Sequence, residues 1–388
     1  MIEDRIKPHH AALTAIRRDL HAHPEMLFEE VRTAAIVARE LEGLGFKVTT
    51  GIAKTGVVGT LSNGTSRRTM GIRADMDALP IHETTNLPHS SKFPGKMHAC
   101  GHDGHTTMLL GTARYLAETK NFDGTVHLIF QPSEEDLGGA KRMIEDGLFK
   151  KFPCDAVFAL HNIPGETAGQ IMVRPGPITA AIDVATLVIR GVGGHGAIPH
   201  KAVDPVVAAS ATVMALQTIV SRNTDPLDAA VVTVGAFNAG SLATVIPEEA
   251  KLLVGLRTCT KAVREMSLRR ITEIATGQAR SYGCTAEVQT GADSWSYPAG
   301  ANTQAEAELV RQVALDMGQD PAKVDMRGPF MFAEDFSYMQ EVVASCYFGL
   351  GAGPGPMLHD PGYDFNDELL VKGPAFWGRL VEKFLPTA

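Results

Sequence analysis

The sequence has few cysteines, no concentrated positive charge and no long apolar run. Its five cysteines are odd in number and widely scattered, which argues against a disulfide framework and predicts a protein of the reduced cytoplasm. The 36 basic and 44 acidic residues give a net charge of -8 without a Lys/Arg cluster, so we expect no nucleic-acid partner. The sequence contains no run of about twenty apolar residues, so we expect no membrane-spanning helix. The first five residues lack a signal peptide's apolar core, so we expect no membrane association and no secretion.

The composition is that of an ordinary globular protein, with 44% hydrophobic and 21% charged residues. A length of 388 residues favours two compact domains. Strand-like runs alternate with helical patterns in the first half of the chain, at 56–61, 69–74, 124–131 and 156–160. This alternation predicts an α/β fold with a mixed, largely parallel sheet flanked by helices.

The pattern changes near Ile182. From there the expected strands and helices follow the order β-α-β-β-α-β, which is typical of a ferredoxin-like α+β domain. We therefore predict a first domain formed by residues 1–182 and 296–388, with a second domain inserted at 183–295.

One short stretch, Met97–His105 (MHACGHDGH), concentrates potential metal ligands ahead of an apolar-periodic run. The pattern predicts a helix to about Glu118 with Asp103 as its N-terminal cap. Cys100 and His102 would then lie just before this helix, and thiolate plus imidazole suit zinc or another late divalent metal. A solvated, histidine-rich loop is the alternative.

Other polar residues follow the expected strands, among them Glu134, Glu135 and His161. Ligands of open α/β sheets gather at the carboxyl ends of parallel strands, so these side chains are candidates for the same site. Hydrolysis of an amide needs an activated water and a stabilised oxyanion, both of which a metal supplies. One glutamate could bind the metal while the other takes the proton of the water. The alternative is a solvated helix start.

These segments resemble the metal-dependent amidohydrolases of the aminoacylase/carboxypeptidase superfamily, in the branch that contains hippurate hydrolases and auxin-conjugate hydrolases. The resemblance runs essentially from end to end of the chain. It implies that residues 1–182 and 296–388 form a zinc-peptidase-like catalytic domain and that the insertion at 183–295 serves as a lid or a dimerisation domain. It rests on segments that include RADMDALPI (73–81), GKMHACGHDGHTTMLLG (95–111), FQPSEE (130–135), GGHGAIPH (193–200) and LHDPGYDFND (358–367).

The resemblance implies two divalent metal ions per subunit, with Glu134 as the general base. The implied ligands are Cys100, His102, Glu135, His161 and His359. The sequence does not choose among zinc, manganese, cobalt and nickel. Asp77 would hydrogen-bond to metal ligands and orient them without binding the metal itself. The alternative is that Asp77 caps the turn before Pro80. A nucleophilic pair of Cys100 and His102 is an alternative that would leave the two glutamates without a task.

The resemblance also implies residues that contact the substrate. In the family a histidine at the position of His195 reaches the active site, often across a dimer, and helps to hold the scissile carbonyl or the substrate carboxylate. Arg257 is a candidate partner of that carboxylate, or a surface arginine. The family usually has asparagine where this chain has Thr244, which leaves the shape of the substrate pocket open. The inserted domain favours a homodimer, with a homotetramer as the alternative.

The implied activity is metal-dependent hydrolysis of N-acyl or N-aroyl L-amino acids, such as hippurate, by an activated water. A dipeptidase or carboxypeptidase at the same site is the alternative. The motif G-x-G-x-x-G at 191–196 raises nicotinamide binding as a rival, but Pro199 and Pro205 interrupt the helix that should follow it. A non-catalytic metal-binding protein is a second rival, which the presence of Glu134 beside all five ligands disfavours.

Overall fold

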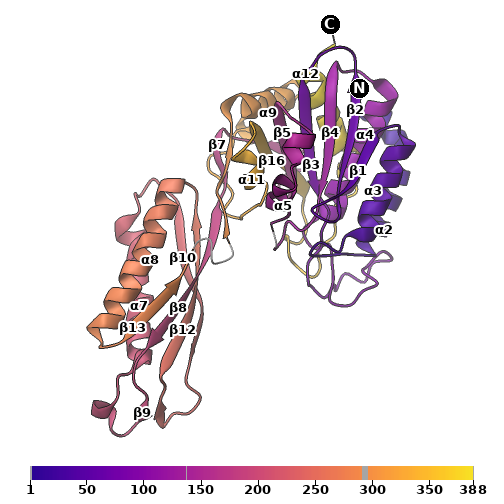
Figure 1. The fold of residues 1–388 in the computed structure, drawn as a ribbon. Helices are drawn as coiled ribbons and strands as arrows, with labels where there is room; N and C mark the ends of the chain where they lie inside the picture. The colour runs from indigo at the N-terminus through magenta and orange to yellow at the C-terminus, as the bar shows by residue number, and fades with distance from the viewer. Residues whose placement is uncertain (1, 137, 291–295, 388) are drawn as a thin grey trace. The chain divides into compact units, whose positions relative to one another are not determined.

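The computed structural model of the protein describes residues 2–136, 138–290 and 296–387. The chain forms two compact units, which are described separately (Figure 1). The main unit comprises Met1–Ile178, Ala301–Gly328 and Asp335–Ala388. The inserted unit comprises Thr179–Gly300 and Pro329–Glu334. Strands β7 (Gly176–Thr179) and β15 (Gly300–Asn302) carry the chain out of the main unit and back into it.

The main unit is built on a seven-stranded sheet with the order β1-β2-β4-β3-β5-β16-β6. Its four central strands, β4, β3, β5 and β16, are parallel, while β1, β2 and β6 are antiparallel to their neighbours. The predicted fold class, a mixed and largely parallel sheet with flanking helices, is confirmed. The strand bounds are β1 Lys47–Ile52, β2 Gly56–Asn63, β3 Thr69–Asp75, β4 Gly124–Gln131, β5 Ala156–Pro164, β6 Ile171–Met172 and β16 Ser345–Gly353.

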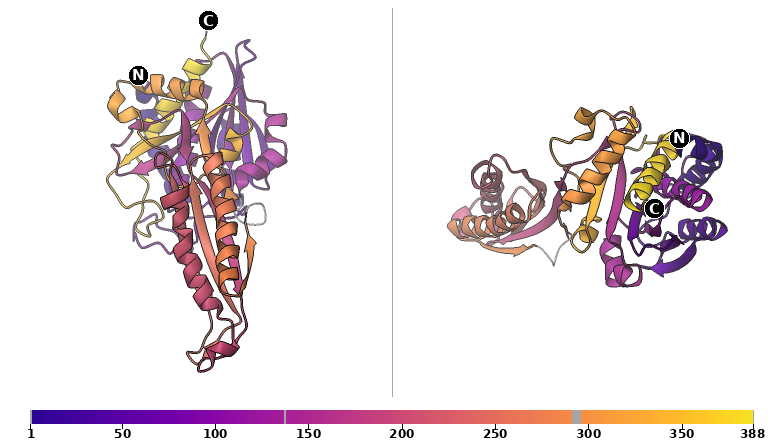
Figure 2. Two further views of the ribbon diagram at one scale, coloured as in Figure 1. Left: turned by 90° about the vertical axis from the view of Figure 1, so that its left-hand side faces the viewer. Right: turned by 90° about the horizontal axis from the view of Figure 1, so that it is seen from above.

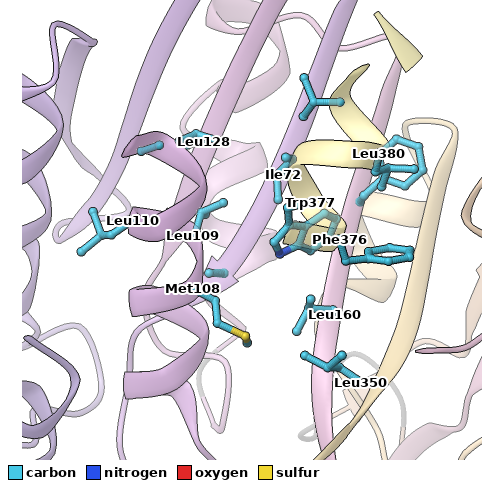
Figure 3. Packing of buried hydrophobic residues seen from close by; sticks show 14 of the residues in the cluster. Ile72, Met108, Leu109, Leu110, Leu128, Leu160, Leu350, Phe376, Trp377 and Leu380 are labelled. Atoms are coloured by element: carbon cyan, nitrogen blue, oxygen red, sulfur yellow. The ribbon is translucent and has the colours of Figure 1, made fainter. Parts of the chain in front are cut away.

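Two long helices, α4 and α12, pack against each other and cover the central strands. Figure 3 shows Met108 and Leu109 of α4 and Trp377 of α12 meeting Ile72 of β3 and Leu160 of β5 in one continuous apolar core. The helices of this unit are α1 Ile2–Ile6, η1 Lys7–His9, α2 His10–His21, α3 Val31–Gly43, α4 His102–Thr119, α5 Gly139–Glu145, α6 Leu148–Lys151, α9 Gln304–Asp316, α10 Pro321–Val324, α11 Ser337–Gln340 and α12 Leu369–Phe384.

The inserted unit has the β-α-β-β-α-β order expected of a ferredoxin-like fold. Its main strands pair antiparallel in the order β10-β12-β8-β13, and α7 and α8 lie side by side across this sheet (Figure 2). Leu187, Leu252, Ala208 and Ile271 contribute to a second apolar core. The bounds are β8 Ala181–Arg190, β9 Gly194–His195, η2 Pro199–Lys201, α7 Pro205–Leu216, η3 Ile219–Asn223, β10 Ala230–Ala239, β11 Val245–Ile246, β12 Glu249–Thr258, α8 Lys261–Ser281, β13 Thr285–Gln289 and β14 Ser296–Tyr297.

One helical stretch of the inserted unit, Pro205–Asn223, has the length and apolar composition of a membrane span. No membrane span was expected from the sequence, because polar residues such as Ser210 and Thr212 interrupt the apolar run. Ala208, Ala209 and Leu216 of this stretch belong to the core of the inserted unit. Packing against the sheet explains only part of its apolar character, since 33% of the stretch is buried.

The parallel strands of the main unit end at a common edge of the sheet. β3 ends at Asp75, β4 is followed by Pro132–Glu135, and β16 is followed by the loop that carries His359. β5 extends to Pro164, so His161 lies inside this strand rather than just beyond it. This edge is where an open α/β sheet is expected to bind its ligand.

Candidate metal centre

The segment around Cys100 turns sharply into helix α4. Gly101 precedes the helix with φ 89°, and a Cβ atom there would lie 2.6 Å from the Tyr363 hydroxyl oxygen, so only glycine fits. The helix begins at His102 and runs to Thr119, close to the expected end. The prediction that Asp103 caps the helix is wrong, because Asp103 already lies in its first turn and directs its carboxylate to His21.

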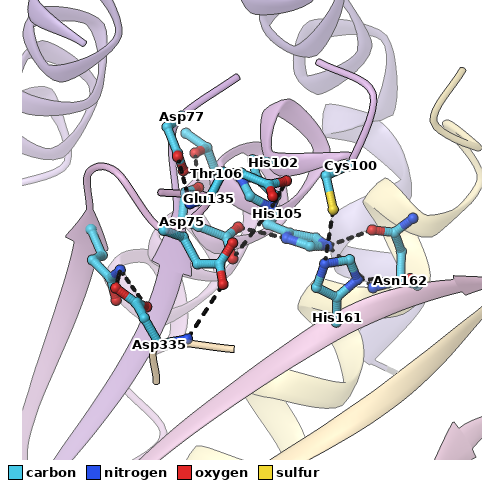
Figure 4. Close-up of polar contacts among 12 residues, drawn as sticks. Asp75, Asp77, Cys100, His102, His105, Thr106, Glu135, His161, Asn162 and Asp335 are labelled. Carbon is cyan, nitrogen blue, oxygen red and sulfur yellow. Dashed lines mark hydrogen bonds and ion pairs between the residues drawn. The ribbon is translucent and has the colours of Figure 1, made fainter. Parts of the chain in front are cut away.

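The five implied metal ligands come together at the sheet edge although they span some 260 residues of sequence. Cys100 Sγ lies 3.4 Å from His161 Nε2, and Glu135 Oε1 lies 3.9 Å from His102 Nε2 (Figure 4). Glu135 Oε1 also lies 3.3 Å from His359 Nε2. The ligand atoms of Cys100, His102 and His161 lie within 4.8 Å of one another, as do those of Cys100, Glu135 and His359. Thiolate, imidazole and carboxylate form a donor set suited to divalent transition metals.

Neighbouring groups determine which nitrogen of each buried histidine can bind a metal. His161 Nδ1 donates to the Asn162 carbonyl oxygen at 2.8 Å, which leaves the lone pair on Nε2. His102 Nδ1 donates to Asp77 Oδ1 at 3.1 Å, so its Nε2 is likewise the ligand atom. The second oxygen of Asp77 accepts the Glu135 backbone N–H at 3.0 Å. One carboxylate thus orients two of the implied ligands.

Two atoms in this cluster are buried without any hydrogen-bond partner, His102 Nε2 and Glu135 Oε1. Unsatisfied buried polar atoms are costly, and here both point toward the same space. Cys100 and His161 add a sulfur and a nitrogen to the same group of atoms. The residues present therefore fit a bound metal ion.

Charge around the cluster also favours a cation. Burial and the negative charge of Glu135 raise the pKa of the Cys100 thiol. Although burial opposes it, Asp75, Asp77 and Glu135 raise the pKa of His102 to about 10. Because the thiol and this imidazole must lose protons to bind a metal, metal binding should strengthen as the pH rises.

His105 lies close to this cluster, and Asp75, His102 and His105 form another group with potential ligand atoms. Its two ring nitrogens, however, each lie 2.6 Å from a partner, Asp75 Oδ1 and Asn162 Oδ1. A histidine engaged at both nitrogens has no lone pair left for a metal. His105 is therefore a neighbour of the cluster rather than a candidate ligand.

Glu134 lies beside the ligand cluster, in a group with His102 and Glu135. Its Oε1 accepts the backbone N–H of Asp335 at 3.3 Å. The Asp335 carboxylate is held in turn by Gln131 at 2.8 Å and by Arg73 at 3.1 Å. Asp335, Gln131 and Arg73 were not predicted as site residues. Asp335 is more than 200 residues from the other two in sequence, and no local pattern indicates that they contact each other.

A buried ionic cluster lies behind the first turn of α4. Arg17 and His21, both fully buried on α2, contact the Asp103 carboxylate at 3.5 and 2.8 Å. Arg17 also pairs with Asp364 and Asp367 at 2.8 Å. His21 thus joins α2 to the helix that carries His102.

The remaining predicted site residues belong to the inserted unit. His195 and Thr244 are exposed and adjacent, since β9 pairs with β11 and the Gly196 N–H donates to the Thr244 carbonyl oxygen at 2.8 Å. Arg257 lies near the other end of β12, where its guanidinium donates to the Met331 carbonyl oxygen at 3.0 Å. The inserted unit thus brings His195 and Thr244 together and separates both from Arg257.

Comparison with known proteins gives consistent matches over nearly the whole chain. The model of peptidase family M20/M25/M40 matches residues 71–383. The hippurate hydrolase of Campylobacter jejuni is 42% identical, over 95% of this chain and 96% of its own length. An IAA-amino acid hydrolase of Arabidopsis thaliana is 40% identical, over 96% of this chain and 85% of its own. A solved Bacillus subtilis structure, described as a dinuclear metal-binding peptidase of the M20 family, superposes with a TM-score of 0.85 at 32% identity, covering 98% of this chain and 100% of the other.

Proposed function

The chain belongs to peptidase family M20/M25/M40, and from this membership we propose that it hydrolyses the amide bond of N-acyl or N-aroyl L-amino acids. The substrate class is that named for the Campylobacter and Arabidopsis relatives. The products would be a carboxylic acid and a free amino acid. The observation that carries the proposal is that two buried ligand atoms, His102 Nε2 and Glu135 Oε1, have no hydrogen-bond partner and lie directly beside Glu134.

The cofactor in this proposal is a pair of divalent metal ions held by Cys100, His102, Glu135, His161 and His359. When bound, such ions acidify water and polarise the scissile carbonyl. The solved dinuclear relative supports the number of ions. A thiolate ligand favours zinc, cobalt or nickel on softness, with manganese as a further candidate.

Within this reaction Glu134 would act as the general base and then as the general acid. Its carboxylate takes a proton from the attacking water and delivers a proton to the departing amine nitrogen. The hydrogen bond from the Asp335 N–H to Oε1 helps to hold the Glu134 carboxylate in place beside the ligand cluster. The backbone link between Glu134 and Glu135 keeps this proton carrier next to a metal ligand.

His195 would stabilise the oxyanion or hold the substrate carboxylate. Its Nδ1 accepts the Ala197 N–H at 3.0 Å, so the neutral ring carries its proton on Nε2. A solvent-exposed Nε2–H is a donor suited to either negatively charged group. The exposed Thr244 beside it would help to shape the substrate pocket, and Arg257 would be a more distant carboxylate partner.

We further infer a cytoplasmic homodimer formed through the inserted unit. Val207 and Met214 are 50% and 73% exposed on one face of α7. β10 is an edge strand on which Val231 and Phe237 are also exposed. An apolar helix face beside an open sheet edge supports self-association.

Amino-acid release from purified protein tests the function. Metal would be stripped by chelation and restored as zinc, manganese, cobalt or nickel. The panel would contain hippurate, several N-acetyl amino acids, an indole-acetyl conjugate and two dipeptides. We expect turnover of the acyl amino acids only after metal is restored. Turnover of dipeptides alone would reassign the chain to the peptidases, and unchanged turnover after complete chelation would refute metal dependence.

Glu134→Gln tests the base within the same assay. We expect kcat to fall by about 10²- to 10⁴-fold with metal still bound, because the amide cannot accept the water proton. Glu145→Gln, an exposed glutamate of α5, is the matched control and should leave kcat unchanged. Near-normal kcat in Glu134→Gln would exclude this residue as the base.

A further inference from the structure

We propose that Glu30, a buried glutamate outside the metal centre, is a positioning residue that fixes Glu134 through the backbone of Ser133. The inference rests on the proposed function, in which Glu134 is the general base. Glu30 directly precedes helix α3 and is 0% exposed. A carboxylate is retained in such a position only when other groups satisfy it.

The Glu30 carboxylate joins three segments that are distant in sequence. Its Oε1 accepts the backbone N–H groups of Phe28 and Ser133, both at 3.1 Å. Its Oε2 accepts the hydroxyl of Thr55 at 2.6 Å. The side chain thus ties the loop before α3 and the turn between β1 and β2 to the turn that follows β4.

These three segments contain most of the unfavourable backbone geometry in the described chain. Five of the eight non-glycine residues with positive φ lie in them, namely Leu27, Phe28, Ala53, Lys54 and Ser133. L-amino acids avoid this region unless surrounding contacts enforce it, and such residues cluster at functional sites. The Glu30 carboxylate accepts a hydrogen bond from each of the three segments, so this one group can hold all three in their positive-φ conformations.

A second contact holds the Ser133 turn from another side. The Gly139 N–H donates to the Ser133 carbonyl oxygen at 3.0 Å. A Cβ atom on Gly139 would lie 1.6 Å from the Pro132 carbonyl oxygen, so the start of α5 is pressed directly against this backbone. Glu30 on the N–H of Ser133 and Gly139 on its carbonyl therefore clamp one peptide segment.

The clamped segment determines where the two catalytic glutamates point. Ser133 has φ 51° and is bonded directly to Glu134. Beyond it, Glu134 accepts the Asp335 N–H at 3.3 Å and the Glu135 N–H donates to Asp77 at 3.0 Å. Relaxation of Ser133 toward ordinary φ values would rotate the following residues away from both partners. Displacement of a catalytic group by about 1 Å can cost 10²-fold in rate.

The hydrogen-bond pattern sets what each variant should do. In Glu30→Gln the amide oxygen can still accept both N–H groups, and the amide nitrogen can donate to the Thr55 hydroxyl. Glu30→Asp keeps the charge but withdraws the carboxylate by one methylene group. Glu30→Ala removes every acceptor. If the position of the acceptor atoms matters more than the charge, Glu30→Gln should keep most of the activity and Glu30→Asp should not.

The test measures kcat and KM on the substrates that wild type turns over, at saturating metal with metal content verified. We expect kcat to fall about 10- to 100-fold in Glu30→Ala and Glu30→Asp with KM nearly unchanged. Glu30→Gln should keep most of the activity. A crystal structure of Glu30→Asp should show Ser133 outside the left-handed region. If the alanine variant does not fold, the aspartate variant carries the test.

Asp123 provides a matched control at the opposite end of β4. Its Oδ1 accepts the backbone N–H groups of Thr65 and Ser66 at 2.6 and 2.7 Å, the same type of contact that Glu30 makes. Asp123→Ala should lower thermal stability and leave kcat unchanged. Equal losses of kcat in the Asp123 and Glu30 variants would overturn the proposal, because they would reduce the effect to general destabilisation.

A double-mutant cycle separates this proposal from the proposed function. If Glu30 acts through Glu134, Glu30→Asp should cost little further activity in the Glu134→Gln background. The same fold-loss in both backgrounds would overturn the positioning role. Wild-type kcat in Glu30→Ala and Glu30→Asp would refute this inference alone. Wild-type kcat in Glu134→Gln would instead refute the base assignment on which it rests.

Discussion

His102, His105 and His161 differ in how many of their ring nitrogens are already hydrogen-bonded, and this sets which of them can bind a metal. His102 and His161 are each held through Nδ1 and present Nε2 to the ligand cluster. His105 is engaged at both nitrogens and serves as a bridge. The residue type was visible in the sequence, but this distinction depends on Asp77, Asp75 and Asn162, which only the folded chain brings near.

Asp77 offers a test at the scale of single residues. In Asp77→Asn one of the two side-chain oxygens becomes an NH2 group, so either the His102 ring N–H or the Glu135 backbone N–H loses its acceptor. We expect metal affinity to fall by about 10- to 100-fold while the fold is retained. Competition with a chromogenic chelator measures the change.

Asp155→Asn is the control for this substitution. Asp155 Oδ2 accepts the Thr69 N–H at 2.8 Å. Its exposed side chain lies at the amino-terminal ends of β3 and β5, whereas the ligand cluster lies at their carboxyl ends. The variant should bind metal like wild type. Unchanged affinity in Asp77→Asn would mean that the ligands are oriented without this carboxylate.

At the scale of secondary-structure elements, α2 and α4 are joined by buried charges. Although burial opposes it, the carboxylates of Asp103 and Glu83 raise the pKa of His21 to about 9. A group whose pKa is raised on folding stabilises the fold at pH values below its ordinary pKa, near 6.5. That contribution is lost as the pH rises through 9. The junction between these helices should therefore weaken in alkali.

Unfolding by urea at several pH values measures this effect. We expect wild type to lose on the order of 2 kcal/mol more stability between pH 6 and 10 than His21→Gln, which cannot carry the charge. His200→Gln, a substitution in an exposed 3-10 helix of the inserted unit, should follow wild type. Parallel pH curves for wild type and His21→Gln would contradict a charged His21.

Elements differ in how well local sequence predicts them. β4 was expected at 124–131, its observed bounds, because the run GTVHLIFQ is rich in strand-forming residues and lies between a glycine and Pro132. β1 was not expected, because Lys47–Ile52 is a half-exposed edge strand without a clear alternation. The sequence also gave no sign of the Glu30–Ser133 contact. Such contacts join turns that are distant in sequence, and no periodic pattern in the sequence indicates which turns will meet.

At the scale of the whole molecule, His195 and Glu134 belong to different compact units. If the proposed homodimer uses His195 of one subunit at the site of the other, two inactive variants should complement each other. Mixed dimers of His195→Ala and Glu134→Gln would contain one intact site each, and random mixing should restore roughly a quarter of wild-type activity. Activity of the co-expressed mixture measures this, and mixed dimers isolated through two affinity tags should show roughly half of wild-type activity.

The control for complementation pairs Glu134→Gln with Cys100→Ser. Both substitutions affect the same site of the main unit, so a mixed dimer should gain nothing beyond its parents. Failure of the His195 pair to recover, with subunit exchange verified, would restrict His195 to its own subunit or exclude it from the reaction.

The order of the strands has a consequence for synthesis on the ribosome. β5 pairs with β3 on one side and with β16 on the other, yet β16 begins about 180 residues later in the chain. At about 5–20 residues per second, the nascent chain must wait on the order of 10 to 40 seconds before that partner emerges. During this time one border of an apolar sheet is open to strands of other molecules, while the inserted unit can already collapse into its own core. Slow translation through the insertion would lengthen this exposure, so yield in a cell should respond to codon choice between β6 and β16 more than elsewhere.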